Sequence, residues 1–155
     1  MIHASVGSEV IEPADVLARV GSDEDGACIL VLGVVRDHAD GRSVSGMRYD
    51  AYVEMAQPVL QAIAEEAAER LGTDRVAVVH RVGELDVGEV SVAIAVSSPH
   101  RAESFDASRY VIEEIKKRLP VWKKEHYVDG SAEWVEGTTP PGTATRGGVE
   151  AGREA

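Results

Sequence analysis

The sequence predicts an α+β domain in which helices cover a mostly antiparallel sheet. Two amphipathic helix patterns, at residues 58–71 and 98–119, lie on either side of two segments in which apolar and smaller or polar residues alternate. These segments, 75–82 and 89–97, are joined by a short turn that contains glycine, as in an antiparallel pair. The elements do not follow strict β-α-β repeats, so the pattern does not favour a wholly parallel sheet.

The first part of the chain predicts two strands with a helix between them. Residues 2–6 favour a short edge strand, and Pro13 lies at the start of a helix that ends near Gly21, where glycine supplies the stop. The near-continuous apolar run 27–36 predicts a central strand that is buried on both faces. Its cysteine, Cys28, is then expected to be a buried hydrophobic residue.

The next part predicts a loop, a strand and a helix. Residues 39–45 are polar and contain glycine, so we expect a loop that becomes ordered when a ligand or partner binds. Residues 46–54 alternate as a half-buried strand does. Pro58 suits the first position of the helix that follows, and Gly72 ends it.

The strand pair 75–82 and 89–97 carries one histidine, His80, on an apolar face. This position favours a core or interface histidine with satisfied hydrogen bonds over a catalytic one. After the helix 98–119, residues 121–128 predict an extended segment, and 133–136 predict a last short strand after a turn at Asp129.

Composition limits the function. The chain has 155 residues, 44% of them hydrophobic, and a formal net charge of −11, which argues against nucleic acid as the main partner. No apolar run is long enough to span a membrane, and the first residues lack the pattern of a signal peptide, so a cytoplasmic location is expected.

The histidines and the single cysteine show no metal-ligand spacing, so we predict no metal and no disulfide. Residues 1–136 form the predicted domain, and 137–155 a flexible tail.

Positive charge gathers around the last predicted helix of this acidic chain. Ser98 is a suitable N-cap, Pro99 suits the first helical position, and the free N–H groups there attract anions. His100 and Arg101 lie on the same turn, where the guanidinium can add a bidentate contact. The sequence therefore predicts a site for a small anion, such as a phosphorylated metabolite.

Lys116 lies at the other end of this helix, inside its apolar stripe. It is about 20° around the helix from Phe105 and four residues after Ile112, so partial desolvation is expected to favour a neutral amine. Pro120 ends the helix, and a chain that folds back there brings Lys123 towards Lys116, which activates an amine through mutual repulsion. The alternative is a lysine that extends into water and stabilises the helix dipole.

Four motifs together resemble the catalytic large subunit family of molybdopterin synthase. They are Gly33-Val-Val-Arg36-Asp-His38, His80-Arg-Val-Gly-Glu-Leu-x-x-Gly88, Ser98-x-His100-Arg101 followed by Phe105, and Lys116-x-x-x-Pro-x-Trp-Lys123-x-Glu125. The resemblance spans about residues 1–136 with the motifs in the family's order, which is more specific than any single motif. It implies the α/β-hammerhead form of the α+β fold.

The resemblance also implies an activity in molybdenum cofactor biosynthesis. Sulfur would pass from the thiocarboxylated C-terminus of a small ubiquitin-like carrier subunit to cyclic pyranopterin monophosphate (precursor Z), forming the dithiolene of molybdopterin. The catalytic subunit would be a homodimer within a heterotetramer, without a cofactor. Lys116 would be the principal catalytic amine and Lys123 would stabilise developing negative charge, whereas the substrate would be bound by Arg36, His100, Arg101, Lys124 and Glu125.

Two departures from the family pattern leave alternatives open. Asp37 stands where the family usually has asparagine, and Gly137-Thr138 follow the last strand where a basic residue is common. The chain could then be an inactive scaffold of the family. A second alternative is a module that binds a phosphorylated metabolite without chemistry. The residues do not decide whether Lys116 forms a covalent link or only transfers protons.

Overall fold

The computed structural model describes residues 1–135; the predicted tail, 137–155, lies outside them. Three helices and nine strands follow in the order β1 (Ile2–Gly7), α1 (Pro13–Leu17), β2 (Ala27–Val34), β3 (His38–Ala39), β4 (Arg42–Ala51), α2 (Val53–Leu71), β5 (Arg75–Arg81), β6 (Gly83–Asp86), β7 (Val90–Ser98), α3 (Arg101–Arg118), β8 (Val121–Tyr127) and β9 (Ala132–Trp134) within the described part.

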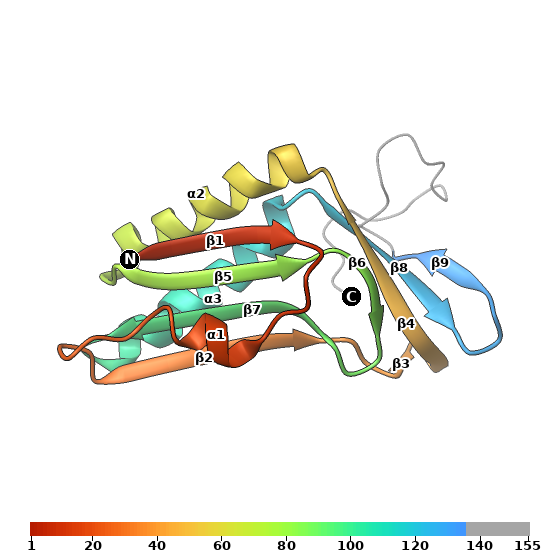
Figure 1. Ribbon diagram of the computed structural model, residues 1–155, viewed down its shortest axis with the longest axis horizontal. Helices are drawn as coiled ribbons and strands as arrows, with labels where there is room; N and C mark the ends of the chain where they lie inside the picture. The colour runs from red at the N-terminus through yellow and green to blue at the C-terminus, as the bar shows by residue number, and fades with distance from the viewer. Residues whose placement is uncertain (136–155) are drawn as a thin grey trace.

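These strands form two sheets (Figure 1). The first has the order β1-β5-β7-β2, with β1 parallel to β5 and the other pairs antiparallel. The second has the order β3-β4-β8-β9, and β6 also pairs with β4. The predicted α+β fold with a mostly antiparallel sheet and covering helices is confirmed, but the strands form two sheets instead of one.

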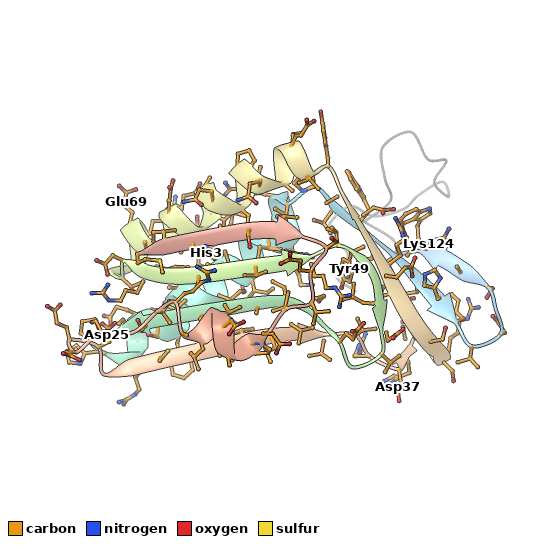
Figure 2. The ribbon with its side chains drawn as sticks, viewed as in Figure 1. His3, Asp25, Asp37, Tyr49, Glu69 and Lys124 are labelled. Atoms are coloured by element: carbon orange, nitrogen blue, oxygen red, sulfur yellow. The ribbon has the colours of Figure 1, made fainter. Side chains whose placement is uncertain are left out.

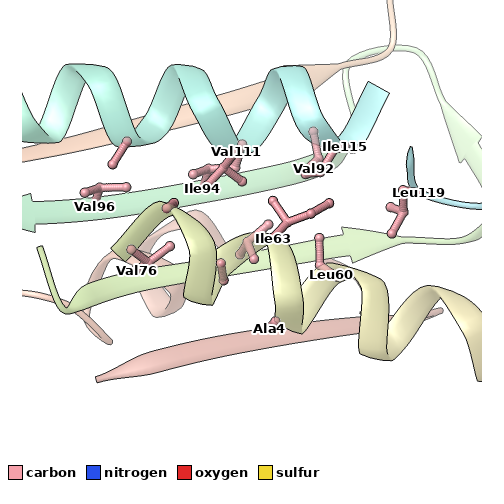
Figure 3. Packing of buried hydrophobic residues seen from close by; sticks show 14 of the residues in the cluster. Ala4, Leu60, Ile63, Val76, Val92, Ile94, Val96, Val111, Ile115 and Leu119 are labelled. Atoms are coloured by element: carbon pink, nitrogen blue, oxygen red, sulfur yellow. The ribbon is translucent and has the colours of Figure 1, made fainter. Parts of the chain in front are cut away.

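The main core lies between the first sheet and the helices α2 and α3 (Figure 3). Strand β7 forms its centre, since eight of its nine residues are buried. Helix α3 presents mainly small residues to this core, which allows close approach to the sheet; its buried positions are Ser104, Ala107, Ser108, Val111 and Ile115. A smaller cluster under α1 covers the other face of the sheet and includes Ile11 and Val16. No helix within residues 1–135 has both the length and the apolar character needed to cross a membrane.

The predicted antiparallel pair of strands, 75–82 and 89–97, is confirmed. Strands β5 and β7 are antiparallel, with Val78 opposite Ile94. The segment between them is more than a turn, because β6 leaves the first sheet and pairs with β4. The last residue of β5 therefore lies where the two sheets meet.

Strand β2 is an edge strand, so the prediction of a central strand buried on both faces is wrong. Among the described strands it pairs only with β7, and its residues alternate between intermediate and exposed along much of its length. Cys28 is exposed instead of buried, and Leu32 and Val34 are 38% and 48% exposed. An apolar run that resembles a buried strand here marks an exposed apolar edge.

Residues 39–45 were expected to be a loop, but most of them lie in strands. Asp40 and Gly41 form a tight turn with φ values of 49° and 78°, and β3 pairs with β4 on either side of it. The polar composition that predicted a loop is that of an exposed hairpin.

Helix α2 begins at Val53, five residues before the predicted start. The amides of Met55 and Ala56 donate to the carbonyl of Tyr52, at 3.0 and 2.7 Å, and form the first turn. Pro58 therefore lies inside the helix, near its start. The predicted end is confirmed, since Gly72 has φ 75° and donates to the carbonyl of Ala68.

Helix α3 begins two residues later than predicted, with His100 as N-cap and Arg101 as its first residue. Ser98 is the last residue of β7, and its hydroxyl donates to the carbonyl of His100 at 2.6 Å, so it does not cap the helix. Phe105 is 60% exposed, so its predicted place in the core-facing stripe is wrong.

A bidentate ion pair joins α2 to α3. Arg118 Nη1 and Nη2 donate to the two carboxylate oxygens of Glu66 at 2.7 and 3.0 Å, and the Tyr110 hydroxyl donates to the same carboxylate at 2.8 Å. The hydrogen bonds from Arg118 and then Tyr110 lower the pKa of Glu66 from 4.5 to about 2. The negative carboxylate is thus favoured in the folded state.

This pair predicts a pH-dependent contribution to stability. Because the folded pKa is lowered, the contribution is present above about pH 4.5 and is lost as the pH falls towards about 2. The pair is part exposed, so we expect at most about 1 kcal/mol, or about 2–4 °C in Tm. Thermal melts should show Glu66→Gln below wild type at about pH 6 and equal to it near pH 2. Glu69→Gln on the exposed side of α2 is the control; a pH-independent difference would contradict the assignment.

Candidate functional site

A cavity of about 850 Å³ lies where the two sheets meet the end of α3. Side chains from several parts of the fold line it, among them Arg36 after β2, Tyr49 on β4, His80 on β5, Lys116 on α3, and Lys123 and Glu125 on β8. Figure 2 shows Tyr49 near this junction of the sheets. Among the described residues that line the cavity, Glu125 is the one carboxylate, so the cavity is positive within a chain of net charge −11.

The turn after α3 brings Lys123 back towards Lys116. Leu119 is buried and ends the helix, and the amide of Val121 donates to its carbonyl at 2.8 Å. The Tyr52 amide, at the junction of β4 and α2, donates to the carbonyl of Pro120 at 3.2 Å and fixes the turn. As predicted, the segment after Pro120 is extended, and both lysines line the same cavity.

Lys116 is an exposed residue at the cavity wall, so the expected desolvation within the apolar stripe is wrong. Ile115 takes the buried position of the last turn, and the next residue is rotated by about 100° from it. The amine of Lys116 is therefore accessible, and the charge of Lys123 lies near by. Both lysines are close enough to His80 to lower its pKa. Its position is that of a group that meets a ligand.

Glu125, Tyr49 and Ser91 line the cavity together with the lysines. The Tyr127 hydroxyl donates to Glu125 Oε1 at 2.7 Å, and burial followed by this hydrogen bond raises the pKa of Tyr127 to about 12. Burial also raises the pKa of Tyr49. A hydrogen bond with Ser91 acts in the opposite direction but has the smaller effect. Both phenols stay protonated and neutral at physiological pH.

His80 lies behind the lysines, with its ring edge-on to Tyr49 at 5.4 Å between centroids. It is 5% exposed, and burial, with smaller contributions from Lys116 and Lys123, lowers its pKa to about 4. The neutral ring adds no charge to the cationic side of the cavity.

Three of the sequence-predicted site residues do not line this cavity. His100 and Arg101 lie at the start of α3, about 22 Å along the helix from Lys116. Lys124 points to the other face of β8, with its Nζ 5.3 Å from the ring centroid of Trp134 (Figure 2). Asp37 lies beside the cavity and its carboxylate contacts His38 Nδ1 at 2.9 Å, which lowers the pKa of Asp37.

The sequence analysis did not single out Tyr49 and Ser91, which line the cavity, and it gave no role to His38 and Trp122, which lie within the quoted motifs and also line it. The alternation of strands 46–54 and 89–97 indicated a face for Tyr49 and Ser91, but not that the faces of two different sheets meet. Gly33 also lines the cavity, where an added Cβ would lie 2.7 Å from Val92 Cγ1 and 3.3 Å from Ser91 Oγ. Glycine here lets the side chains of Val92 and Ser91 pack closely against β2.

The described residues contain no group of three or more histidine, cysteine or carboxylate side chains that could hold a metal ion. The cationic groups of the cavity suit an anionic ligand such as phosphate or a carboxylate. Cys28 lies at the far end of β2, about 26 Å along the strand from Arg36, and does not line the cavity.

Residues 6–118 match the family model described as MoaE protein. A molybdopterin synthase catalytic subunit from Halalkalibacterium halodurans is 45% identical over 120 residues, 77% of this chain and 76% of that protein. The crystal structure of molybdopterin synthase from Staphylococcus aureus is 35% identical with a TM-score of 0.79, covering 84% of this chain and 94% of that one. A protein-protein complex of subunits 1 and 2 of molybdopterin-converting factor from Helicobacter pylori shares the fold, with a TM-score of 0.67 at 18% identity over 90% of this chain and 93% of that one.

Proposed function

Since this chain belongs to the MoaE protein family, we propose that it is the catalytic subunit of a molybdopterin synthase in molybdenum cofactor biosynthesis. Its substrate is then precursor Z, and its partner is the small ubiquitin-like subunit that carries a C-terminal thiocarboxylate. The observation that supports this best is the cavity that gathers Arg36, Lys116 and Lys123 from three separate segments. The complex of subunits 1 and 2 from H. pylori supports the choice of partner by its fold. The expected cytoplasmic location stays a prediction.

The cavity provides what the reaction needs. Arg36 binds the cyclic phosphate, and Lys116 contacts the thiocarboxylate and moves protons. The thiocarboxylate sulfur bonds to an electrophilic substrate carbon, where a carbon–oxygen bond breaks and the oxygen leaves after it is protonated. Water then hydrolyses the resulting thioester: the bond between sulfur and the carrier's carbonyl carbon breaks, sulfur stays on the substrate, and water supplies the oxygen of the carrier's carboxylate. A second carrier supplies the second sulfur. Lys123 stabilises the oxyanion that develops at the carrier's carbonyl. Glu125, held by Tyr127, positions the neighbouring groups, and Cys28 is too distant to supply sulfur.

His100 and Arg101 reach the substrate only if a second copy of the chain supplies them. The exposed edge of β2 suggests how, because an edge strand can pair antiparallel with its own copy about a two-fold axis. The end of β2 that precedes Arg36 would then lie beside the start of the other copy's β2. The start of β2 lies close to the start of α3 in the same chain. The amide of Gly26, just before β2, donates to the carbonyls of Ser98 and Pro99, just before α3. In this homodimer each cavity gains His100 and Arg101 from the other subunit.

Lys124 is a weaker candidate for substrate binding in this proposal. Its ammonium stacks on Trp134, on the face of β8 away from the cavity. We assign it a role in holding β8 against β9, and we keep Glu125 as the residue of this pair that lines the substrate site.

The function is tested by mixing the purified chain with precursor Z and thiocarboxylated carrier. We expect dithiolene product, measured by trapping the pterin as a fluorescent derivative, and no product when the carrier ends in an ordinary carboxylate. Binding of precursor Z without any conversion would support the metabolite-binding module, and an inactive chain that still binds the carrier would support the inactive scaffold.

A further inference from the structure

His80 is a buried residue to which the proposed reaction gives no role. It is 5% exposed, lines the cavity from β5, and packs edge-on against Tyr49. Sequence alone favoured a core histidine with satisfied hydrogen bonds. Only one side of the ring is satisfied in the structure.

The hydrogen bonds of His80 fix its tautomer. Nδ1 lies 3.0 Å from the carbonyl oxygen of Arg81, and because a carbonyl only accepts, Nδ1 carries the hydrogen. Nε2 is then an acceptor with a free lone pair. Within residues 1–135 this nitrogen has no hydrogen-bond partner, although the ring is more than nine-tenths buried. Nε2 is not among the fully buried polar atoms that lack a partner, and His80 lines the cavity, so this nitrogen can be reached from the cavity by a ligand or water that supplies a donor.

The charges around His80 keep it an acceptor. The groups that face it are the ammonium groups of Lys116 and Lys123 and the neutral phenol of Tyr49. Burial and the two positive charges lower its pKa to about 4, so the ring is neutral wherever the enzyme works near neutral pH. The cavity thus has a cationic side suited to phosphate and a neutral side that accepts hydrogen bonds.

We propose that His80 is a substrate-binding residue whose Nε2 accepts a hydrogen bond from an N–H or O–H group of the uncharged ring system of the substrate. The proposal rests on the proposed function, in which the ligand is a pterin phosphate: the phosphate has acceptors only, whereas the pterin ring carries N–H donors. His80 therefore recognises the heterocycle, and Arg36 and the lysines recognise the phosphate. We do not propose that His80 accepts a proton from a lysine, because its lowered pKa opposes that transfer.

The test compares the binding of precursor Z and of inorganic phosphate by calorimetry. We expect His80→Phe, which keeps a flat ring but removes the acceptor, to weaken precursor Z binding about tenfold and to change phosphate binding less than about twofold. His80→Gln, which can place an oxygen near the position of Nε2, should recover most of the loss. His3→Phe replaces a histidine of β1 outside the cavity and should leave both affinities unchanged.

Equal precursor Z binding by folded wild type and His80→Phe would overturn the proposal. Should His80→Phe not fold, the ¹⁵N resonance of His80 Nε2 in the wild-type protein decides: it should move on addition of precursor Z and not of phosphate, and an unchanged resonance refutes the role. The conversion assay separates this result from the proposed function. Product formation with no effect at His80 refutes the binding role alone, whereas an effect at His80 without product refutes the sulfur-transfer function alone.

Discussion

Lys116→Ala is expected to reduce the rate of dithiolene formation by at least about a hundredfold, the range typical for loss of a group that transfers protons in the reaction. Its side chain lines the same cavity as Lys123. Because the residue is exposed, its removal leaves no cavity in the core, so the Tm should change little. Single-turnover assays with precursor Z and thiocarboxylated carrier measure the effect.

Lys117→Ala is the matched control for this change. Lys117 touches the rim of the cavity, but its side chain is 69% exposed and its Nζ lies 3.3 Å from Glu114, away from the site. We expect this variant to stay within about twofold of wild type, since exposed ion pairs contribute little. If Lys116→Ala converts substrate as fast as Lys117→Ala, the catalytic role of Lys116 is wrong.

Mixing two inactive variants, Lys116→Ala and Arg101→Ala, is expected to restore activity. If each cavity combines Lys116 of one subunit with Arg101 of the other, a mixed dimer contains one site with both residues and one with neither. Random exchange makes half of the dimers mixed, so about a quarter of wild-type activity should return. The measurement is the conversion rate after the variants are mixed under conditions that allow subunit exchange.

The control for this experiment mixes Lys116→Ala with Lys123→Ala. Both lysines line the same cavity of one chain, so every site in a mixed dimer lacks one of them and no activity should return. Recovery in this control, or none in the first mixture although subunits exchange, would contradict a site shared between two copies.

Local patterns predicted most of the elements but not their place in the fold. Periodicity was sufficient for β5 and β7, because their side chains alternate between the main core and the smaller cluster under α1, and for the body of α3, because one face of this helix is buried. It failed for β2, whose apolar residues indicated a central strand although it lies at an edge. A run of apolar residues indicates side chains that are suited to burial. It does not show whether another strand of the same chain or another molecule buries them.

The site shows the same limit. Arg36, Lys116, Lys123 and Glu125 were proposed from motifs, and the structure brings them to one cavity. His80 was assigned to packing, because sequence cannot show that its Nε2 faces a cavity where two sheets meet. His100 and Arg101 stay predictions, since their place in the site depends on a second chain.

The length of α3 links the two ends of the proposed site. The helix runs from Arg101 to Arg118 without interruption, with the proposed anion-binding pair, His100 and Arg101, at its start and the proposed catalytic amine of Lys116 in its last turn. One residue inserted in or deleted from its middle would turn Lys116 by about 100° and shift it by about 1.5 Å relative to Arg101. In the proposed homodimer each subunit contributes the two ends of α3 to two different cavities, so such a change would misalign both cavities at once.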